Sequence, residues 1–337
     1  MKAVAYQTAG SLDRTDALVD VDLDKPVAAG RDLLVKVEAI SVNPVDTKVR
    51  ANASAEPGDW KVLGWDVSGE VVAVGADVRN FSVGDTVFYA GALNRPGANS
   101  EYHLVDERIV GRKPAALTHP EAAALPLTAI TAWEMLFDRL QVSKPVAGAA
   151  PAVLIIGGAG GVGSIAIQLL RALTDLTVIA TASRPQTQDW VRALGAHHVV
   201  DHSKPLAPQV AELGNGQPAF VFSTTETGLH LADIADLIAP QGRFGLIDDP
   251  AVLDINPFKR KSVSVHWEFM FTRSMFQTAD IDEQGKLLNE IAALVEAGKI
   301  RTTLTEVMRP INAQNLKAAH AVLESGKARG KLVLEGF

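Results

Sequence analysis

The 337-residue chain contains no cysteine. That absence excludes disulfide bonds, thiol catalysis, iron–sulfur clusters and every zinc site that uses a cysteine ligand. No apolar run reaches the roughly 18 residues that a membrane-spanning helix needs, and the N-terminal segment MKAVAYQTAG lacks the apolar stretch of a secretory signal. We therefore expect a cytoplasmic protein that does not contact the membrane.

An excess of basic residues is also absent. The chain carries 32 Lys and Arg against 39 Asp and Glu, a formal net charge of −7, so we expect no nucleic-acid partner. Hydrophobic residues make up 47% and charged residues 21%, which is typical of a folded globular protein. At roughly 100–200 residues per domain, the length predicts two domains.

The sequence divides into a β-rich part and a part in which strands and helices alternate. Asp32–Ser41, Val67–Val74 and Asp85–Tyr89 alternate apolar and polar residues, as the short strands of a barrel-like domain do. From about residue 152 to residue 270, six apolar runs are separated by amphipathic helix-like segments. This order predicts an α/β fold with a doubly wound six-stranded parallel sheet. The six runs are Val153–Ile156, Thr177–Thr181, His198–Asp201, Ala219–Ser223, Arg243–Ile247 and Ser262–Trp267.

A capping-box pattern marks the point where the β-rich part gives way to helix. The Thr118 hydroxyl and the Glu121 carboxylate are three residues apart, so each can satisfy a free backbone N–H at a helix start. Pro120 falls in the first turn, where its missing N–H costs little. We therefore predict a helix that begins directly after Thr118.

A glycine-rich segment carries the strongest chemical signal. Residues 157–163 read GGAGGVG, and Gly158, Gly160 and Gly163 fit the pattern G-x-G-x-x-G. The segment follows a predicted strand and opens a predicted helix, which is the context that gives this pattern its meaning. Glycine lets the backbone approach a pyrophosphate, and the positive end of the helix then holds the anion. We predict a dinucleotide site rather than a glycine-rich turn without a ligand.

The residues after the next predicted strand favour NADPH over NADH. NAD-binding folds of this kind place an acidic residue about 20 positions beyond the glycines, where it binds the ribose hydroxyls. Ser183 and Arg184 take that place here, and Asp175 comes before the strand. A hydroxyl and a guanidinium can hydrogen-bond a 2′-phosphate that a carboxylate would repel. The alternative is that Arg184 is an ordinary solvated residue at a helix start.

Motifs along the whole chain add a resemblance. They are Asn43-Pro44-Val45-Asp46, Gly64-Trp65-Asp66-Val67-Ser68-Gly69, Leu125-Pro126-Leu127-Thr128, the glycine-rich segment and Gly330-Lys331-Leu332-Val333-Leu334. With these motifs the chain resembles the medium-chain dehydrogenase/reductase superfamily, in particular its zinc-free, quinone-oxidoreductase-like (zeta-crystallin-like) branch. Residues 266–273, HWEFMFTR, are similar to a subgroup often labelled zinc-type alcohol dehydrogenase-like.

The resemblance implies a Rossmann domain, residues 127–273, inserted into a β-rich GroES-like catalytic domain of residues 1–126 and 274–337. The nicotinamide would face Asn43 and Trp65 in the cleft between them. For His202, a contact with the 2′-phosphate and a plain surface position are both open. The cofactor-binding residues that the resemblance implies are Asn43, Thr128, Gly158, Gly160, Gly161, Val162, Gly163, Ser183, Arg184, His202, Thr224, Ile247 and Phe271.

The ligands of a catalytic zinc are missing from the corresponding positions. Zinc enzymes of this superfamily carry a Cys three residues before an Asp, and a Gly-His-Glu; this chain has Asn43 before Asp46, and Gly64-Trp65-Asp66. A catalytic zinc needs three protein ligands, and Asn and Trp do not replace a thiolate and an imidazole. His197, His198 and His202 lie around one predicted strand, where neighbouring side chains point to opposite faces. We expect no metal site.

Without a metal to polarise an alcohol oxygen, the best hydride acceptors are molecules that are already electron-poor. Quinones and α,β-unsaturated carbonyls fit, because NADPH supplies the hydride and water or a hydroxyl can supply the proton. We expect Asn43 and Trp65 at the catalytic site. Among the three tyrosines only Tyr89 is a candidate to line it, and a position in the core is its alternative.

Two other functions stay open. No proton donor is evident, so a nucleotide-binding protein with little turnover, in a structural or binding role, is one alternative. A zinc-free alkenal or enoyl reductase is the other, although residues 47–59 contain no tyrosine at the place where some enoyl reductases of the superfamily carry one. The sequence does not identify the physiological substrate.

A homodimer is expected through residues 262–270. Relatives pair this last strand of the nucleotide-binding sheet across a two-fold axis, which covers an edge that would otherwise invite aggregation. The aromatic side chains Trp267 and Phe269 could line a substrate pocket, but we expect them to fill the core or the subunit contact.

Overall fold

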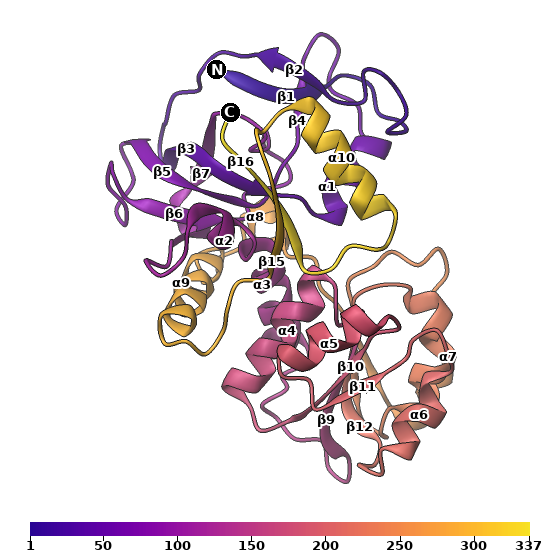
Figure 1. Ribbon diagram of the computed structural model, residues 1–337. Helices are drawn as coiled ribbons and strands as arrows, with labels where there is room; N and C mark the ends of the chain where they lie inside the picture. The colour runs from indigo at the N-terminus through magenta and orange to yellow at the C-terminus, as the bar shows by residue number, and fades with distance from the viewer. The chain divides into compact units, whose positions relative to one another are not determined.

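The computed structural model describes residues 1–337, which divide into two units. Unit 1 comprises Met1–Ile130 and Phe271–Phe337, and unit 2 is Thr131–Met270, the magenta-to-orange middle of the chain in Figure 1. Thr128 and Phe271, which the sequence expectation placed in the nucleotide-binding domain, thus belong to unit 1. No helix combines the length and the apolar character that crossing a membrane would need.

Unit 1 is built on two β-sheets. The larger has seven strands in the order β15–β16–β3–β5–β6–β8, with β7 paired to β3, and the smaller has the order β2–β1–β4. The strands of the larger sheet are β3 (Asp32–Ser41), β5 (Val67–Val74), β6 (Thr86–Tyr89), β7 (Tyr102–Asp106), β8 (Val110–Arg112), β15 (Leu304–Met308) and β16 (Lys331–Glu335). Those of the smaller are β1 (Lys2–Tyr6), β2 (Val19–Asp22) and β4 (Lys61–Val62).

The helix that begins directly after Thr118 starts where the sequence supplies capping groups. Thr118 Oγ1 accepts a hydrogen bond from the Glu121 N–H, and the Thr118 N–H donates to Glu121 Oε2 at 2.9 Å, so the predicted capping box is confirmed. The helices are α1 (Pro44–Asn52), η1 (Glu107–Ile109), α2 (His119–Ala123), α3 (Pro126–Trp133, which runs on into unit 2), α8 (Thr272–Phe276), α9 (Glu283–Glu296) and α10 (Ala313–Glu324).

Unit 2 contains one parallel sheet of six strands in the order β11–β10–β9–β12–β13–β14, which confirms the predicted fold class. Its core includes Leu154, Val221 and Phe244 from neighbouring strands. The strands are β9 (Ala150–Ile156), β10 (Thr177–Thr181), β11 (His198–Val200), β12 (Pro218–Ser223), β13 (Arg243–Leu246) and β14 (Ser264–Trp267). The helices are the π-helix η2 (Glu134–Arg139), α4 (Gly161–Leu173), α5 (Pro185–Ala193), α6 (Leu206–Glu212), α7 (Thr227–Leu237) and the 3₁₀-helix η3 (Asn256–Lys261).

The strand order predicts where unit 2 would bind a ligand. From β9 the chain first adds β10 and β11 on one side, then returns to add β12, β13 and β14 on the other. In open α/β sheets, ligands bind outside the carboxyl ends of the strands where the order reverses. Here that point lies at the ends of β9 and β12, which is where the glycine-rich segment begins.

Candidate functional site

The glycine-rich segment turns sharply from β9 into α4. Gly157 has a φ of 81°, a conformation that side chains rarely adopt, and its N–H donates to Thr181 Oγ1 at 3.0 Å. A Cβ on Gly158 would lie 2.9 Å from the Ala180 Cβ, and one on Gly163 only 2.4 Å from the Gly157 carbonyl oxygen. These glycines are therefore required by the packing of the protein itself.

Gly160 differs from its neighbours because the protein leaves space beside it. A Cβ there would meet only the Gly157 carbonyl oxygen, at an ordinary 3.5 Å, and the backbone φ of −71° suits any residue. Gly160 is the N-cap of α4, and Gly161 and Val162 begin the helix, so backbone N–H groups face this space. The cradle fits a dinucleotide pyrophosphate, which needs a close backbone approach at this position.

Three polar residues gather at the neighbouring strand ends. Ser183 is half-buried, and Arg184 is exposed at the N-cap of α5, where its N–H donates to Thr187 Oγ1 at 3.2 Å. His202 Nδ1 lies 3.1 Å from Thr181 Oγ1. Burial, together with the nearby charges of His230 and Arg184, lowers the pKa of His202, so its imidazole is mostly neutral at pH 7. The arrangement offers hydrogen-bond donors to the 2′ position of the adenosine ribose in a dinucleotide.

Two further predicted cofactor residues lie at the same end of the sheet. Thr224 directly follows β12, and its hydroxyl donates to the Ile156 carbonyl at 2.8 Å, which joins β12 to the end of β9. Ile247 follows β13 and is half-buried. The structure thus brings the predicted contacts of unit 2 to the carboxyl ends of five adjacent strands, β11, β10, β9, β12 and β13.

Unit 1 contains a buried cluster of four polar residues, which we call the Lys331 cluster: Asn43, Asp46, Asp66 and Lys331. None is more than 3% exposed. Asn43 and Asp46 open α1, Asp66 precedes β5, and Lys331 is the first residue of β16. Since buried charges are costly unless they are paired and hydrogen-bonded, the pairing within the cluster decides whether it stabilises the protein.

Every donor of the Lys331 ammonium has an acceptor. Nζ donates to the Val42 carbonyl at 2.9 Å, to Asp66 Oδ2 at 3.0 Å and to Asn43 Oδ1. The Asn43 amide group in turn donates to Asp66 Oδ2 at 2.9 Å. Both ends of the Asn43 side chain are therefore engaged inside the protein, and sequence reasoning, which cast Asn43 as a catalytic and cofactor contact, missed this role.

The two aspartates of the cluster tie separate segments together. Asp46 accepts hydrogen bonds from the Asn43 N–H at 2.7 Å and the Gly64 N–H at 3.0 Å. Asp66 Oδ1 accepts from the Leu127 N–H at 2.7 Å and so holds the start of α3, next to the predicted cofactor residue Thr128. Thr128 itself is buried, and its hydroxyl donates to the Leu125 carbonyl at 3.0 Å.

Burial raises the pKa of both carboxyl groups in the cluster. The pKa of Asp46 rises to about 7, although its backbone hydrogen bonds and the Lys331 charge favour the ionised form. The pKa of Asp66 is also raised by burial, against the opposing charge of Lys331. With two carboxyl groups and one ammonium, the cluster is electrically balanced when one carboxyl carries a proton.

Trp65 lies beside the cluster and is part of the interior. Its side chain is 2% exposed, and the indole N–H donates to the Ala92 carbonyl at 3.3 Å. Its ring packs edge-on against Phe271, another predicted cofactor residue, with ring centres 6.1 Å apart. No three His, Asp or Glu side chains of the chain lie together in a way that could hold a metal ion.

Tyr89 is fully enclosed within unit 1. Its ring stacks on His103 with centres 5.6 Å apart, and the two side chains are hydrogen-bonded at 3.0 Å between the hydroxyl and Nδ1. The Pro96 carbonyl, 3.0 Å from His103 Nε2, can only accept, so Nε2 carries the hydrogen and the Tyr89 hydroxyl donates to Nδ1. Burial raises the pKa of Tyr89 well above its usual value. Its part in catalysis stays a prediction.

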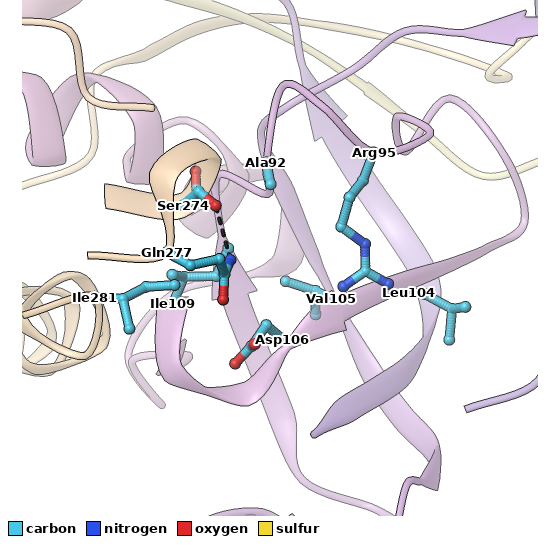
Figure 2. Close-up of a pocket in the computed structure, with 9 residues that line it drawn as sticks. All are labelled: Ala92, Arg95, Leu104, Val105, Asp106, Ile109, Ser274, Gln277 and Ile281. Carbon is cyan, nitrogen blue, oxygen red and sulfur yellow. Dashed lines mark hydrogen bonds between the residues drawn. The ribbon is translucent and has the colours of Figure 1, made fainter. Parts of the chain in front are cut away.

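A small cavity in unit 1 is not large enough for a substrate. Its volume is about 20 Å³, room for about one water molecule, whereas ligand sites typically measure roughly 300–1,000 Å³. Figure 2 shows Arg95, Asp106 and Gln277 around it, with Gln277 hydrogen-bonded to the Ser274 carbonyl at 2.8 Å. We therefore do not assign this cavity to catalysis.

Comparison with known proteins identifies the family of the chain but not its substrate. Residues 29–115 match the alcohol dehydrogenase GroES-like domain, and residues 194–334 match the zinc-binding dehydrogenase family. The chain is 40% identical to a zinc-type alcohol dehydrogenase-like protein of Staphylococcus aureus strain MSSA476, over 99% of both chains. It belongs to the zinc-type alcohol dehydrogenase-like proteins of the medium-chain dehydrogenase/reductase superfamily. The predicted family is therefore confirmed, and the chain is an oxidoreductase of a family that binds NAD(P)H.

Other relatives of this family carry different names. A bovine mitochondrial NAD(P)H oxidoreductase is 31% identical, over 90% of this chain and 81% of its own. A solved structure from Rhizobium etli CFN 42, described as a candidate zinc-dependent alcohol dehydrogenase, is 65% identical with a TM-score of 0.99, over 100% of this chain and 98% of its own. The quinone oxidoreductase of Coxiella burnetii is 26% identical with a TM-score of 0.81, over 100% and 99%. These names do not agree on a substrate.

Proposed function

We propose that the chain is a zinc-independent reductase that uses NADPH to reduce quinones or α,β-unsaturated carbonyls. The observation that carries this proposal is the state of the two residues that stand where zinc enzymes have Cys and His. Asn43 is engaged with Lys331 and Asp66, and Trp65 is buried with its indole N–H on a backbone carbonyl. Neither side chain offers a ligand that a zinc ion prefers.

The choice of substrate class follows from what the chain's residues can and cannot supply. The nicotinamide, when bound, supplies a hydride. A Lewis acid is needed most where the substrate is an alcohol or a carbonyl whose oxygen must be polarised. Quinones and enones are already electron-poor and need it least. The names of the Coxiella burnetii and bovine relatives, a quinone oxidoreductase and an NAD(P)H oxidoreductase, agree with this class.

Turnover with a panel of acceptors tests the proposal. Purified protein is mixed with NADPH and, in separate assays, with a 1,4-quinone, a 1,2-quinone or an alkenal. A further assay contains a primary alcohol and NADP⁺ instead. We expect NADPH oxidation with at least one quinone or alkenal, and none of the reverse reaction with the alcohol. Tight NADPH binding without turnover on any acceptor would instead favour a binding role. This second candidate stays open because the hydroxyl of Tyr89, the one tyrosine considered for the catalytic site, is enclosed and hydrogen-bonded to His103.

A matched pair of glycine variants distinguishes an effect on cofactor binding from an effect on the stability of the fold. Gly160→Ala adds a methyl group where the protein leaves space, so the free energy of unfolding should change by less than about 1 kcal/mol. The same methyl group should obstruct the pyrophosphate and weaken NADPH binding by about tenfold or more. Gly163→Ala adds its Cβ 2.4 Å from the Gly157 oxygen and should destabilise the protein by about 1–3 kcal/mol.

Calorimetric titration with NADPH and urea unfolding of both glycine variants give the comparison. If Gly160→Ala binds NADPH as tightly as the wild type does, the dinucleotide does not use this cradle.

We also propose that the protein is a homodimer through β14. This strand is an edge of the sheet, with Trp267 52% exposed on it and Phe269 48% exposed just beyond. Val265, on the same strand, packs against the core of unit 2, so a charge there would disturb the fold itself. Trp267 is the better position for a test.

Trp267→Lys should therefore convert a dimer into a monomer of 35.8 kDa. Light scattering at micromolar concentration gives the mass, and Leu173→Lys, on a 40% exposed position at the end of α4, is the control that should stay dimeric. A wild-type protein that is monomeric throughout this concentration range would overturn the proposal.

A further inference from the structure

Hydrogen bonds between three side chains tie together the carboxyl ends of two neighbouring strands of unit 2, β12 and β13. We call this set the Thr227 network: Ser223, Thr227 and Asp248. Ser223 ends β12, Thr227 begins α7, and Asp248 lies two residues beyond β13. Ser223 and Thr227 are fully buried, and Asp248 is half-buried. The network thus lies at the same end of the sheet as the glycine-rich segment.

The direction of each hydrogen bond in the network follows from its partners. The Asp248 carboxylate can only accept, so the Thr227 hydroxyl donates to its Oδ1, and the Thr227 N–H donates to its Oδ2 at 2.8 Å. The Ser223 hydroxyl donates to Thr227 Oγ1 at 2.7 Å, because its other acceptor, the Thr225 carbonyl, is 3.5 Å away. Asp248 therefore holds both polar groups of the first residue of α7.

Asp248 takes the part that an N-cap side chain usually plays for a helix. Glu226, the residue before α7, makes no side-chain cap, and its φ of 51° is uncommon for a residue with a side chain. Asp248 instead supplies the acceptor for the first N–H of α7 from the neighbouring strand end. Strained backbone persists where surrounding contacts determine it. The network therefore fixes the path of the chain between β12 and α7.

The predicted cofactor residues Thr224 and Ile247 lie on the segments that the network joins. The last residues of β12 and β13 are paired in register, so the next residue of each segment, Thr224 and Ile247, lies beside the other. Thr224 also borders the glycine-rich segment, because a Cβ on Gly157 would lie 2.3 Å from its hydroxyl oxygen. Any displacement of these segments would therefore alter the wall of the proposed cofactor site.

The strand order indicates which half of a dinucleotide would meet this wall. Ser183 and Arg184 follow β10, on one side of β9, whereas β12 and β13 lie on the other side. A dinucleotide with its pyrophosphate at Gly160 and its 2′-phosphate near Arg184 would extend its second half over β12 and β13. That second half carries the nicotinamide.

We propose that Thr227 and Asp248 are positioning residues for the nicotinamide half of NADPH, because their hydrogen bonds hold the segments that carry Thr224 and Ile247. This role rests on the proposed use of NADPH at the glycine-rich segment. Neither residue is assigned a direct contact with the cofactor, since Thr227 is enclosed and the Asp248 carboxylate bonds back to it. The two halves of the cofactor should therefore depend differently on the network.

Calorimetric titration with the whole cofactor and with its adenosine half tests this difference. Thr227→Val keeps the shape of the side chain but removes the hydroxyl, so NADPH should bind about 5- to 30-fold more weakly. Adenosine 2′,5′-bisphosphate, which lacks the nicotinamide, should bind within about twofold of its wild-type affinity. Thr227→Ser keeps the hydroxyl and should bind both molecules as the wild type does.

Thr174→Val is the matched control for the loss of a threonine hydroxyl. The Thr174 hydroxyl donates to the Leu170 carbonyl at 2.7 Å at the C-terminal end of α4, away from the strand ends that the network joins. This variant should leave the affinity for both molecules unchanged.

Asp248→Ala tests the same role from the other side of the network and at a half-buried position, where a substitution is better tolerated than at Thr227. It removes both acceptors and should weaken NADPH binding without weakening the binding of adenosine 2′,5′-bisphosphate. Removal of a negative charge alone would strengthen the binding of an anion, so the expected change has the opposite sign. Asp254→Ala, where the carboxylate accepts from the Asn256 N–H at 3.0 Å, is the charge control and should weaken neither molecule.

The fluorescence of the reduced nicotinamide gives a reading that does not depend on affinity. At saturating NADPH, the anisotropy of this emission should be lower in Thr227→Val than in the wild type and in Thr227→Ser, because the ring is held less firmly. If the wild type binds both molecules, and Thr227→Val and Asp248→Ala bind NADPH equally well or weaken both molecules alike, the positioning role is wrong while the use of NADPH stands. If the wild type binds neither molecule, the use of NADPH is wrong and the positioning role fails with it.

Discussion

Replacing Lys331 by methionine should lower the free energy of unfolding by about 3–5 kcal/mol, the usual cost of leaving one partner of a buried ion pair behind. Methionine keeps much of the length and apolar character of the side chain but removes the ammonium. The Asp66 carboxylate, the Asn43 amide oxygen and the Val42 carbonyl would then each lose a donor inside the protein. Urea unfolding of both proteins gives the difference.

The pH dependence distinguishes this mechanism from a simple loss of packing. Burial already raises the pKa of Asp66, and without Lys331 the pKa should rise further. An aspartate with a raised folded-state pKa stabilises at low pH and loses that contribution as pH rises, so the penalty of Lys331→Met should be smaller near pH 5 than near pH 8. Lys299→Met, on an exposed position, should cost little at either pH. An equal penalty at both pH values would contradict the role of Asp66.

Replacing Arg184 by alanine should weaken NADPH binding by about 10- to 150-fold and leave NADH binding almost unchanged. Arg184 lies at the N-cap of α5, close enough to His202 to lower its pKa, at the end of the sheet where a 2′-phosphate would lie. Hydrogen bonds to charged groups contribute about 1.5–3 kcal/mol, and about 1.4 kcal/mol corresponds to tenfold in affinity. Titration of both cofactors against both proteins measures the selectivity.

Arg192→Ala is the matched control for Arg184. Arg192 lies on the same helix and pairs with Asp189 at 3.4 Å, so its removal changes the net charge of the protein equally. It should leave the ratio of NADPH to NADH affinity unchanged. If Arg184→Ala weakens both cofactors alike, the guanidinium does not read the phosphate, and the preference for NADPH loses its main support.

The features predicted from sequence are those that short segments determine. The capping box needs only Thr118 and Glu121, three residues apart, and the glycine-rich segment needs only its neighbouring strand and helix. The six strands of unit 2 were recognised because each is an apolar run, and helix-like segments separate all but the last two. Hydrogen bonds within a few residues of each other, and burial on both faces of a parallel sheet, leave their pattern in the local sequence.

The Lys331 cluster could not be predicted in the same way. Its contacts join positions 265 and 288 residues apart in the chain, and no local pattern identifies an interior lysine. Sequence reasoning quoted Asn43, Asp66 and Lys331 in three separate motifs without bringing them together. A signal was nevertheless present, because a lysine that opens an apolar strand such as KLVL calls for a buried acceptor.

The π-helix was missed as well. The i→i+5 turn that carries Glu134, seen in the hydrogen bond from the Leu140 N–H to the Met135 carbonyl at 2.8 Å, has no distinct sequence pattern.

The measurement that bears most directly on the proposed function is NADPH oxidation by metal-free protein. Purified protein is treated with a chelator, its zinc content is measured, and the initial rate with NADPH and a quinone is compared before and after treatment, with NADH in parallel. We expect far less than one zinc per chain, an unchanged rate and a clear preference for NADPH. About one zinc per chain, with activity lost on chelation and restored by zinc, would contradict it.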